Sequence, residues 1–223
     1  MIRVVVADDQ AIVRAGFTVI VEAAGDIQVV GEAKDGYEAV ELARALRPDV
    51  VCMDIRMPGR DGIEATRLLS SDDEGHIPVL VVTTFDLDDY VFGALEAGAA
   101  GFLLKGADED TLVDAIRSVA AGEGTLDQKI TRRVLSEFAG RRSSPARHVD
   151  AVAETFTGRE VDILRLLTEG LSNQEIAARL FIEASTVKYH LAGLLAKIGA
   201  RDRLQAVVWA FRNGFDAADP AGR

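Results

Sequence analysis

The stretch VVCMDIRMPGRDG, residues 50–62, decides how the first half of the chain folds. Its first four residues are apolar, as in a strand that is covered on both faces, and Asp54 follows them directly. Pro58 and Gly59 then turn the chain away from the strand. An aspartate at a strand end is often only a turn residue, so this position alone leaves a structural role open. The rest of the chain has to indicate whether Asp54 carries chemistry.

The segment belongs to a regular alternation of strands and helices that runs through residue 121. Its apolar runs are rich in Val and Ile and show little period-two alternation, which is typical of parallel strands. Strands are expected at 2–7, 27–33, 49–54, 78–85 and 100–105, and helices at 11–24, 36–46, 61–70, 88–98 and 109–121. This pattern predicts an α/β fold, a doubly wound, five-stranded parallel sheet in the flavodoxin-like order 2-1-3-4-5.

The charge divides the 223-residue chain into two unlike parts. Residues 1–125 hold 10 Lys and Arg against 24 Asp and Glu, a net charge of −14, and residues 126–223 hold 15 against 12, a net charge of +3. Such asymmetry indicates two domains with different partners. No apolar run approaches the roughly 20 residues of a membrane helix, and the N-terminus lacks a signal-peptide pattern. We therefore expect a cytoplasmic protein without membrane contact, whose single cysteine, Cys52, is a buried structural thiol.

Polar and charged residues stand where the expected strands end. Asp8 and Asp9 follow the first strand, Asp54 ends the third, Thr83 and Thr84 the fourth, and Lys105 the fifth. In a sheet of this order, these ends meet at the crevice where the strand order reverses. Three neighbouring carboxylates need cations, and one Mg²⁺ with Lys105 would balance their charge. Asp54 is then a candidate nucleophile toward a phosphoryl group, with Thr83 as a hydrogen-bond donor.

Each of these residues also has a purely structural interpretation. Asp8 and Asp9 are compatible with helix caps, Thr83 with an ordinary strand residue and Lys105 with a solvated surface charge. Their occurrence at four separate strand ends favours the functional interpretation.

The stretches VVVADDQ, VVCMDIRMPGRDGIEA, VLVVTTFD and GFLLKG resemble the receiver domain of bacterial two-component response regulators. The resemblance covers about residues 1–121 and implies that a sensor histidine kinase phosphorylates Asp54. The implied magnesium ligands are Asp8, Asp9, Asp54 and the main-chain carbonyl of Arg56.

The same resemblance implies how the phosphoryl group is sensed. Thr83 and Lys105 would contact it, and Thr83 and Phe102 would form the conformational switch. Phe102 lacks the hydroxyl of the tyrosine found in many relatives, and it is also compatible with a plain core residue. The acidic segment 70–78 has no predicted role.

From residue 156 onward the pattern is wholly helical, with short helices expected near 158–168, 173–180, 184–198 and 201–213. The helix at 184–198 has one apolar stripe at helical spacing. Its members are Val187, Leu191, Leu194, Leu195 and Ile198. Two short helices joined by a tight turn and followed by a polar-faced helix form a helix-turn-helix layout, whose second helix enters the major groove. A generic three-helix interaction module is the alternative.

The stretches REVDILRLL, GLSNQEIAARL, STVKYHL and KIGARDR resemble the LuxR-type helix-turn-helix, and the whole chain resembles the NarL/FixJ subfamily of response regulators. The resemblance implies that Lys188 and Tyr189 face bases, that Thr186, His190 and Lys197 face phosphates, and that Asn173 and Gln174 lie near the DNA backbone. His190 is also compatible with a buried helix residue. Helix 201–213 would be the surface of a homodimer that forms on phosphorylation and binds an inverted repeat in double-stranded DNA.

These patterns predict a receiver at 1–121, a partly helical linker at 122–155, a LuxR-type domain at 156–214 and a flexible tail at 215–223. The expected function is phosphorylation-dependent transcriptional regulation, with no enzymatic activity on an external substrate. One alternative is a phosphatase or mutase of the haloacid dehalogenase type, but these carry D-x-D, whereas Ile55 and Arg56 follow Asp54. The other is a phosphate-independent DNA-binding protein whose receiver is only a dimerisation platform.

Overall fold

The computed structural model describes residues 1–72, 75–84, 88–126, 155–213 and 215. The chain divides into two compact units, Met1–Ile130 and Thr131–Arg223. Most of the expected linker and all of the expected tail except Phe215 lie outside the described residues. Within the described part of the chain, no helix is both long and apolar enough to cross a bilayer.

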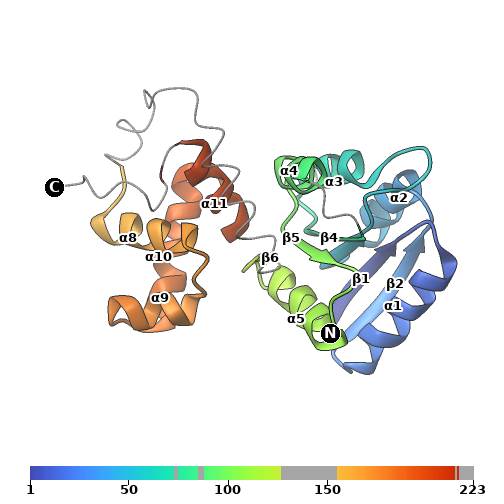
Figure 1. The fold of residues 1–223 in the computed structure, drawn as a ribbon, viewed down its shortest axis with the longest axis horizontal. Coiled ribbons are helices and arrows are strands. Elements are labelled where there is room, and N and C mark those ends of the chain that lie inside the picture. Colours follow the sequence, from blue (N-terminus) through green and yellow to red (C-terminus); the bar gives the residue numbers. More distant parts are fainter. Residues whose placement is uncertain (73–74, 85–87, 127–154, 214, 216–223) are drawn as a thin grey trace. The chain divides into compact units, whose positions relative to one another are not determined.

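The first unit alternates strands with helices, as the sequence predicts (Figure 1). Its strands are β1 (Ile2–Ala7), β2 (Ile27–Ala33), β3 (Val50–Met53), β4 (Val79–Thr83), β5 (Gly101–Leu104) and β6 (Thr125–Leu126). Its helices are α1 (Ala11–Ala23), α2 (Gly36–Leu46), α3 (Gly62–Ser70), α4 (Asp88–Glu96) and α5 (Glu109–Ala120). Side chains of Asp35, Asp61 and Asp108 accept backbone N–H groups at the starts of α2, α3 and α5. These N-caps fix where the three helices begin.

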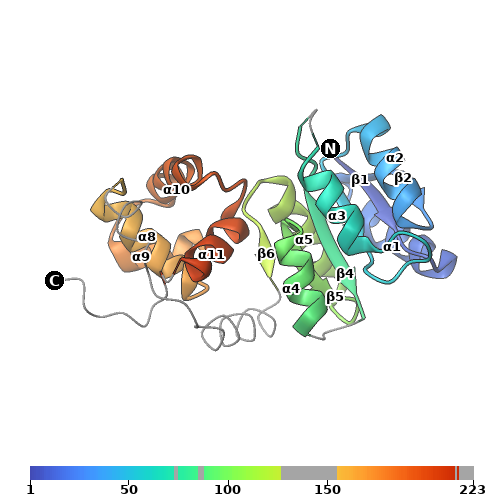
Figure 2. The ribbon, with the colours of Figure 1, turned by 90° about the horizontal axis from the view of Figure 1, so that it is seen from above.

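All strands of the sheet are parallel, in the order β2-β1-β3-β4-β5-β6. Helices α1 and α5 cover one face, and α2, α3 and α4 cover the other (Figure 2). Every residue of β3 and β4 is buried, because helices lie on both faces of these central strands. The predicted doubly wound order 2-1-3-4-5 is confirmed.

The sheet has one strand more than the sequence predicts. Thr125 in β6 lies opposite Gly101 in β5, and its backbone N–H donates to the Ala100 carbonyl at 3.2 Å. A Cβ atom at Gly101 would lie 2.8 Å from the side chains of both Leu80 and Thr125, so a glycine permits this close approach. The first residues of the expected linker therefore belong to the sheet. A strand of two residues carries no periodic pattern by which it could be predicted.

The segment 70–78, which had no predicted role, accepts hydrogen bonds from two arginines at the end of α2. The Asp72 side chain is 4% exposed and accepts hydrogen bonds from Arg44 Nε at 2.6 Å and from Arg47 Nη2 at 3.4 Å. Arg47 also donates through Nη1 to the Gly75 carbonyl at 3.1 Å. The acidic character of the segment thus has a structural explanation at Asp72.

Cys52 lies in the centre of β3 and is 2% exposed. Its burial raises the pKa of the thiol to about 12. Because the thiolate is the reactive species, this cysteine is chemically inert. The prediction of a buried structural thiol is confirmed.

The described residues of the second unit, 155–213 and 215, form α8 (Gly158–Thr168), α9 (Asn173–Leu180), α10 (Ala184–Ile198) and α11 (Arg203–Arg212). Capping boxes open α8, with Thr157 and Glu160, and α9, with Ser172 and Glu175. The predicted apolar stripe of α10 faces the core: Val187, Leu191 and Leu194 are buried, and Leu195 and Ile198 pack partly buried against them. The predicted all-helical unit is confirmed.

Candidate functional site

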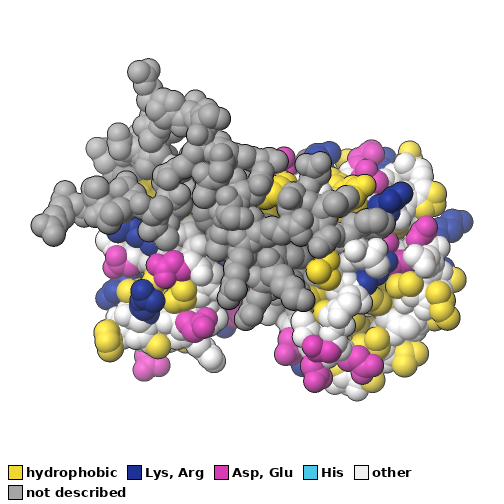
Figure 3. Space-filling model, viewed as in Figure 1, with side chains coloured by type: hydrophobic (Ala, Val, Ile, Leu, Met, Phe, Trp, Pro, Cys, Tyr) yellow, Lys and Arg dark blue, Asp and Glu magenta, His cyan; other side chains and the backbone are white. Residues whose placement is uncertain are grey.

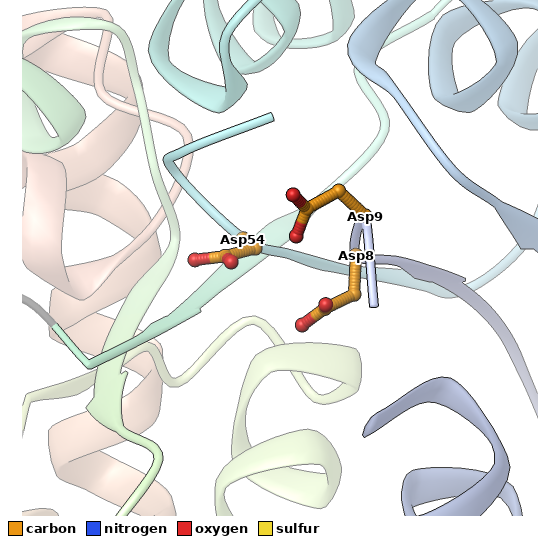
Figure 4. A group of neighbouring side chains, drawn as sticks. All are labelled: Asp8, Asp9 and Asp54. Atoms are coloured by element: carbon orange, nitrogen blue, oxygen red, sulfur yellow. The ribbon is translucent and has the colours of Figure 1, made fainter. Parts of the chain in front are cut away.

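Three carboxylates meet at the crevice beyond the ends of β1 and β3, where the strand order reverses. Asp8 and Asp9 follow β1, Asp54 follows β3, and ligand oxygens of all three lie within 4.8 Å of one another. Figure 4 shows the three side chains extending to the same side of the strand ends. Asp8 and Asp54 are 3% and 5% exposed, whereas Asp9 is exposed to solvent. The fold therefore brings together the three acidic residues that the sequence places at strand ends.

Asp54 is held from several sides. Its backbone N–H donates to the Ala7 carbonyl at 2.8 Å, which ties the end of β3 to β1. Its Oδ1 accepts from the Ile55 N–H at 2.8 Å, and its Oδ2 accepts from Lys105 Nζ at 2.8 Å. On the other side lies the start of α3, where a Cβ atom at Gly62 would stand only 1.9 Å from the Asp54 carbonyl oxygen. Asp54 thus has a fixed backbone and a fixed carboxylate.

Lys105 reaches the same carboxylates from the residue after β5. Its Nζ donates to Asp8 Oδ2 at 2.5 Å and to Asp54 Oδ2 at 2.8 Å. Burial alone would lower the pKa of Lys105, but the hydrogen bonds and charges of Asp54 and Asp8 raise it above its usual value. The ammonium group therefore stays protonated and balances one of three neighbouring negative charges.

The remaining charge makes this crevice suitable for a divalent cation. Among the described residues, none donates a hydrogen bond to the carboxylate of Asp9, so its oxygens are available as ligands. Arg56 lines the same cavity as Asp9 and Asp54. A donor set of oxygens alone, open to water on one side, suits Mg²⁺, which keeps several of its waters. The residues present fit this ion.

A cavity of about 720 Å³ opens beside the acidic residues. It is lined by Asp9, Gln10, Asp54, Ile55, Arg56, Met57, Pro58, Asp61, Thr84 and Tyr90. Thr83 is fully buried, and its carbonyl accepts from the Lys105 N–H at 2.9 Å. The sequence places Thr84 at the end of the fourth strand without a predicted role, and Tyr90 belongs to no predicted site. Thr84 follows the last residue of β4, Val79–Thr83, so its side chain lies at the mouth of the crevice rather than inside the sheet.

Phe102 lies opposite Val81 of β4 and is fully buried. The structural alternative for this residue, a place in the core, is therefore what the fold shows. Its part in a conformational switch stays a prediction.

The exposed face of α10 offers the side chains expected to read DNA. Lys188 is exposed, Tyr189 is 77% exposed, and Thr186 is partly buried beside them. The ring of His190 packs edge-on against the ring of Tyr189, with 5.6 Å between the centroids. Gln174, at the start of α9, is also exposed. The face opposite the buried stripe is therefore polar and accessible.

Charge is distributed differently on the two units. On the face shown in Figure 3, acidic side chains gather along the lower edge of the first unit, whereas acidic and basic side chains alternate on the second unit. This distribution agrees with the net charges of −14 and +3 in the two parts of the sequence. A weakly positive surface binds a polyanion poorly by charge alone, so DNA binding by this unit would require specific contacts in addition.

Comparison with known proteins shows that each unit matches a known protein family. Residues 4–117 match the response regulator receiver domain, and residues 154–210 match the luxR family of bacterial regulatory proteins. The chain belongs to the two-component response regulators. It is 43% identical over 213 residues to the uncharacterized transcriptional regulatory protein YxjL and to the transcriptional regulatory protein LiaR, both from Bacillus subtilis. Each alignment covers 96% of this chain, and the two alignments cover 96% of YxjL and 98% of LiaR.

The match extends to a solved structure of similar length. The response regulator ChrA of a heme-sensing two-component system is 37% identical, with a TM-score of 0.52, covering 96% of this chain and 98% of ChrA. This response regulator thus combines a receiver with a LuxR-type DNA-binding domain, as the sequence predicts. Relatives described as transcriptional regulators favour that class over a phosphatase or mutase.

Two residues that this response regulator was expected to place at DNA have partners inside the fold. Lys197 Nζ donates to Glu160 Oε2 at 2.6 Å and to the Thr155 carbonyl at 3.0 Å. Asn173 is 9% exposed, and its Oδ1 accepts from Arg203 Nη1 at 3.1 Å. The ion pair with the buried carboxylate of Glu160 favours a structural role for Lys197, and the expected phosphate contact of this residue stays a prediction. No local sequence pattern could show this pair, whose members are 37 residues apart.

Proposed function

We propose that phosphorylation of Asp54 controls DNA binding by this response regulator. One observation carries the proposal: the nearly buried carboxylate of Asp54 lies at a cavity of about 720 Å³, close to both the ammonium of Lys105 and the exposed carboxylate of Asp9. A transferring phosphoryl group brings further negative charge to a site that already holds three carboxylates. Lys105 supplies one compensating charge, and Asp8 and Asp9 are suited to hold a second cation.

In the proposed reaction, a lone pair on a carboxylate oxygen of Asp54 attacks phosphorus and forms a P–O bond. The P–N bond of a phosphohistidine on the kinase breaks, and its electron pair leaves with the imidazole, which takes up a proton. Lys105 keeps its own proton and neutralises charge on the resulting acyl phosphate. When held by Asp8, Asp9, Asp54 and the main-chain carbonyl of Arg56, Mg²⁺ would supply positive charge to the phosphoryl oxygens.

Thr83 is proposed to donate its hydroxyl to a phosphoryl oxygen and to pass the change to Phe102. Both residues are fully buried on adjacent strands, where Thr83 lies opposite Leu104 and Phe102 lies opposite Val81, two residues earlier along each strand. Packed cores respond to small shifts by discrete rearrangement rather than by smooth deformation.

The proposed output is recognition of double-stranded DNA by α10. Lys188 is suited to a guanine edge and Tyr189 to a thymine methyl group, while Thr186, His190 and Gln174 would face phosphates. One recognition helix reads only a few base pairs, so useful affinity requires two copies. A homodimer through α11 would present them to an inverted repeat.

Intact-mass measurement after incubation with acetyl phosphate and Mg²⁺ tests the phosphoacceptor. The parent chain should gain one phosphate, and Asp54→Asn should gain none, because the amide keeps the shape but is no nucleophile. Asp61→Asn serves as the matched control, since Asp61 lines the same cavity and should leave labelling unchanged. Equal labelling of Asp54→Asn and the parent would refute the assignment. If phosphorylation occurs but DNA affinity stays the same, the receiver is a dimerisation platform only.

A further inference from the structure

We infer that Arg14 is a positioning residue for the metal site, which it serves by fixing the peptide group between Asp8 and Asp9. This inference rests on the proposed function, because it concerns the same acidic crevice. Arg14 lies on α1, and its side chain is only 16% exposed. It is therefore a partly buried cation next to a site whose own ligands are acidic.

The guanidinium of Arg14 connects three elements. Its Nη1 donates to the main-chain carbonyl oxygen of Asp8 at 2.7 Å, just beyond β1. Its Nε donates to Glu32 Oε2 at 3.2 Å, near the end of β2. Because the guanidinium is planar and its donors are fixed in a fork, these two bonds set its orientation relative to both strands.

The bond to the Asp8 carbonyl determines the direction of Asp9. The peptide group that joins the two aspartates is planar, so holding its oxygen orients the plane and the Cα of Asp9. Asp8 itself does not depend on this bond, since its N–H donates to the Ala33 carbonyl at 3.0 Å and its carboxylate accepts from the Gln10 N–H and from Lys105.

Asp9 has no comparable support of its own. Its exposed carboxylate accepts no hydrogen bond from any residue that the structure describes. The direction of this ligand therefore comes from the backbone, and Arg14 is the side chain that holds the backbone there.

Positioning and simple electrostatics predict opposite effects for the loss of Arg14. By Coulomb's law, removing a positive charge beside a cation site should strengthen Mg²⁺ binding. Loss of positioning should weaken it, because residues that orient metal ligands are typically worth tenfold or more in affinity. Arg14→Lys separates the two further: it keeps the charge, so electrostatics predicts no change, but a single ammonium cannot reproduce the planar fork.

Titration calorimetry of the full chain with Mg²⁺ alone measures this effect. We expect the Kd for Mg²⁺ to rise roughly tenfold in Arg14→Met and to rise in Arg14→Lys. Arg117→Met is the matched control, because Arg117 pairs with Asp26 and Asp114 on the surface and should leave the Kd unchanged. Far-UV circular dichroism verifies that each variant folds. If Arg14→Met does not fold, the Kd of Arg14→Lys for Mg²⁺ tests the positioning role.

Unchanged or tighter Mg²⁺ binding in the folded Arg14 variants would overturn the positioning role. A parent chain that binds no Mg²⁺ would overturn the proposed metal site itself. Mg²⁺ binding in the parent that is lost in Asp9→Ala and weakened in both Arg14 variants supports the inference.

Discussion

Replacement of Lys197 by methionine is expected to destabilise the DNA-binding unit without changing the salt dependence of DNA binding. Lys197 Nζ lies 2.6 Å from Oε2 of Glu160, a residue that is 5% exposed. Removing one partner of a buried ion pair costs about 3–5 kcal/mol. The Lys197 side chain is 34% exposed, and Thr157 continues to donate to Glu160 through its N–H and hydroxyl at 2.7 and 3.0 Å. We therefore expect a smaller loss, about 2 kcal/mol.

Urea unfolding of the full chain, followed by tryptophan fluorescence, measures this loss in the relevant unit. Trp209 is the single tryptophan of the sequence and packs against the core of the second unit. The double variant with Glu160→Gln closes a thermodynamic cycle and isolates the pairwise energy. Glu160→Gln should lower the free energy of unfolding less than Lys197→Met does, because a buried amide carries no uncompensated charge.

The pair should also appear in the pH dependence of stability. Burial alone would raise the pKa of Glu160, but hydrogen bonds from Lys197 and Thr157 and the charge of Lys197 lower it below its usual value. A lowered carboxyl pKa stabilises the fold at neutral pH, and this contribution is lost as the pH falls through the folded-state pKa. Lys197→Met should therefore lose less stability on acidification than the parent does.

Titration against DNA at two salt concentrations provides the decisive comparison. Lys197→Met should keep the salt slope of the parent, since its ammonium is not expected at a phosphate. A variant that unfolds like the parent but loses about one unit of salt slope would place Lys197 at a phosphate and refute the reasoning.

Two further substitutions test local features. Gly62→Ala would place a Cβ 1.9 Å from the Asp54 carbonyl oxygen, so it should cost about 1–3 kcal/mol in chemical unfolding and slow phosphorylation, whereas Gly106→Ala, with open space around it, should do neither. Burial raises the pKa of Asp202 from 3.8 to about 6, so the contribution of this carboxyl group to stability is lost as the pH rises through that range. Asp202→Asn should therefore stabilise the helical unit more at pH 7 than at pH 4, which urea unfolding followed by Trp209 fluorescence measures. Equal effects at both pH values would contradict the buried charge at Asp202.

Local sequence patterns were sufficient to predict the elements of both units. Runs of Val and Ile without alternation predict strands covered on both faces, and β3 and β4 are buried along their whole length. The apolar spacing in 184–198 predicts the buried stripe of α10 in the same way. Strand order then follows from a small set of allowed connections, which is why Asp8, Asp9 and Asp54 could be placed together.

Partners far apart in the chain could not be predicted in this way. The sequence places Lys197 and Glu160 on two different expected helices, but nothing local indicates that the two side chains meet. The same holds for Arg14 with the Asp8 carbonyl and for Asp72 with Arg44 and Arg47. Long charged side chains have many rotamers and reach several neighbours, so only the packed fold selects one partner.

The chain by itself therefore determined which residue types stand at the strand ends and which face of α10 stays polar. Those features depend on periodicity and on the order of elements, which are properties of contiguous sequence. Only the tertiary structure decided that Thr84 lines the cavity, that Arg14 donates to the carbonyl of Asp8 and that Lys197 pairs with Glu160. Each of these depends on the distance between atoms from separate elements, and that distance is fixed only when the elements pack together.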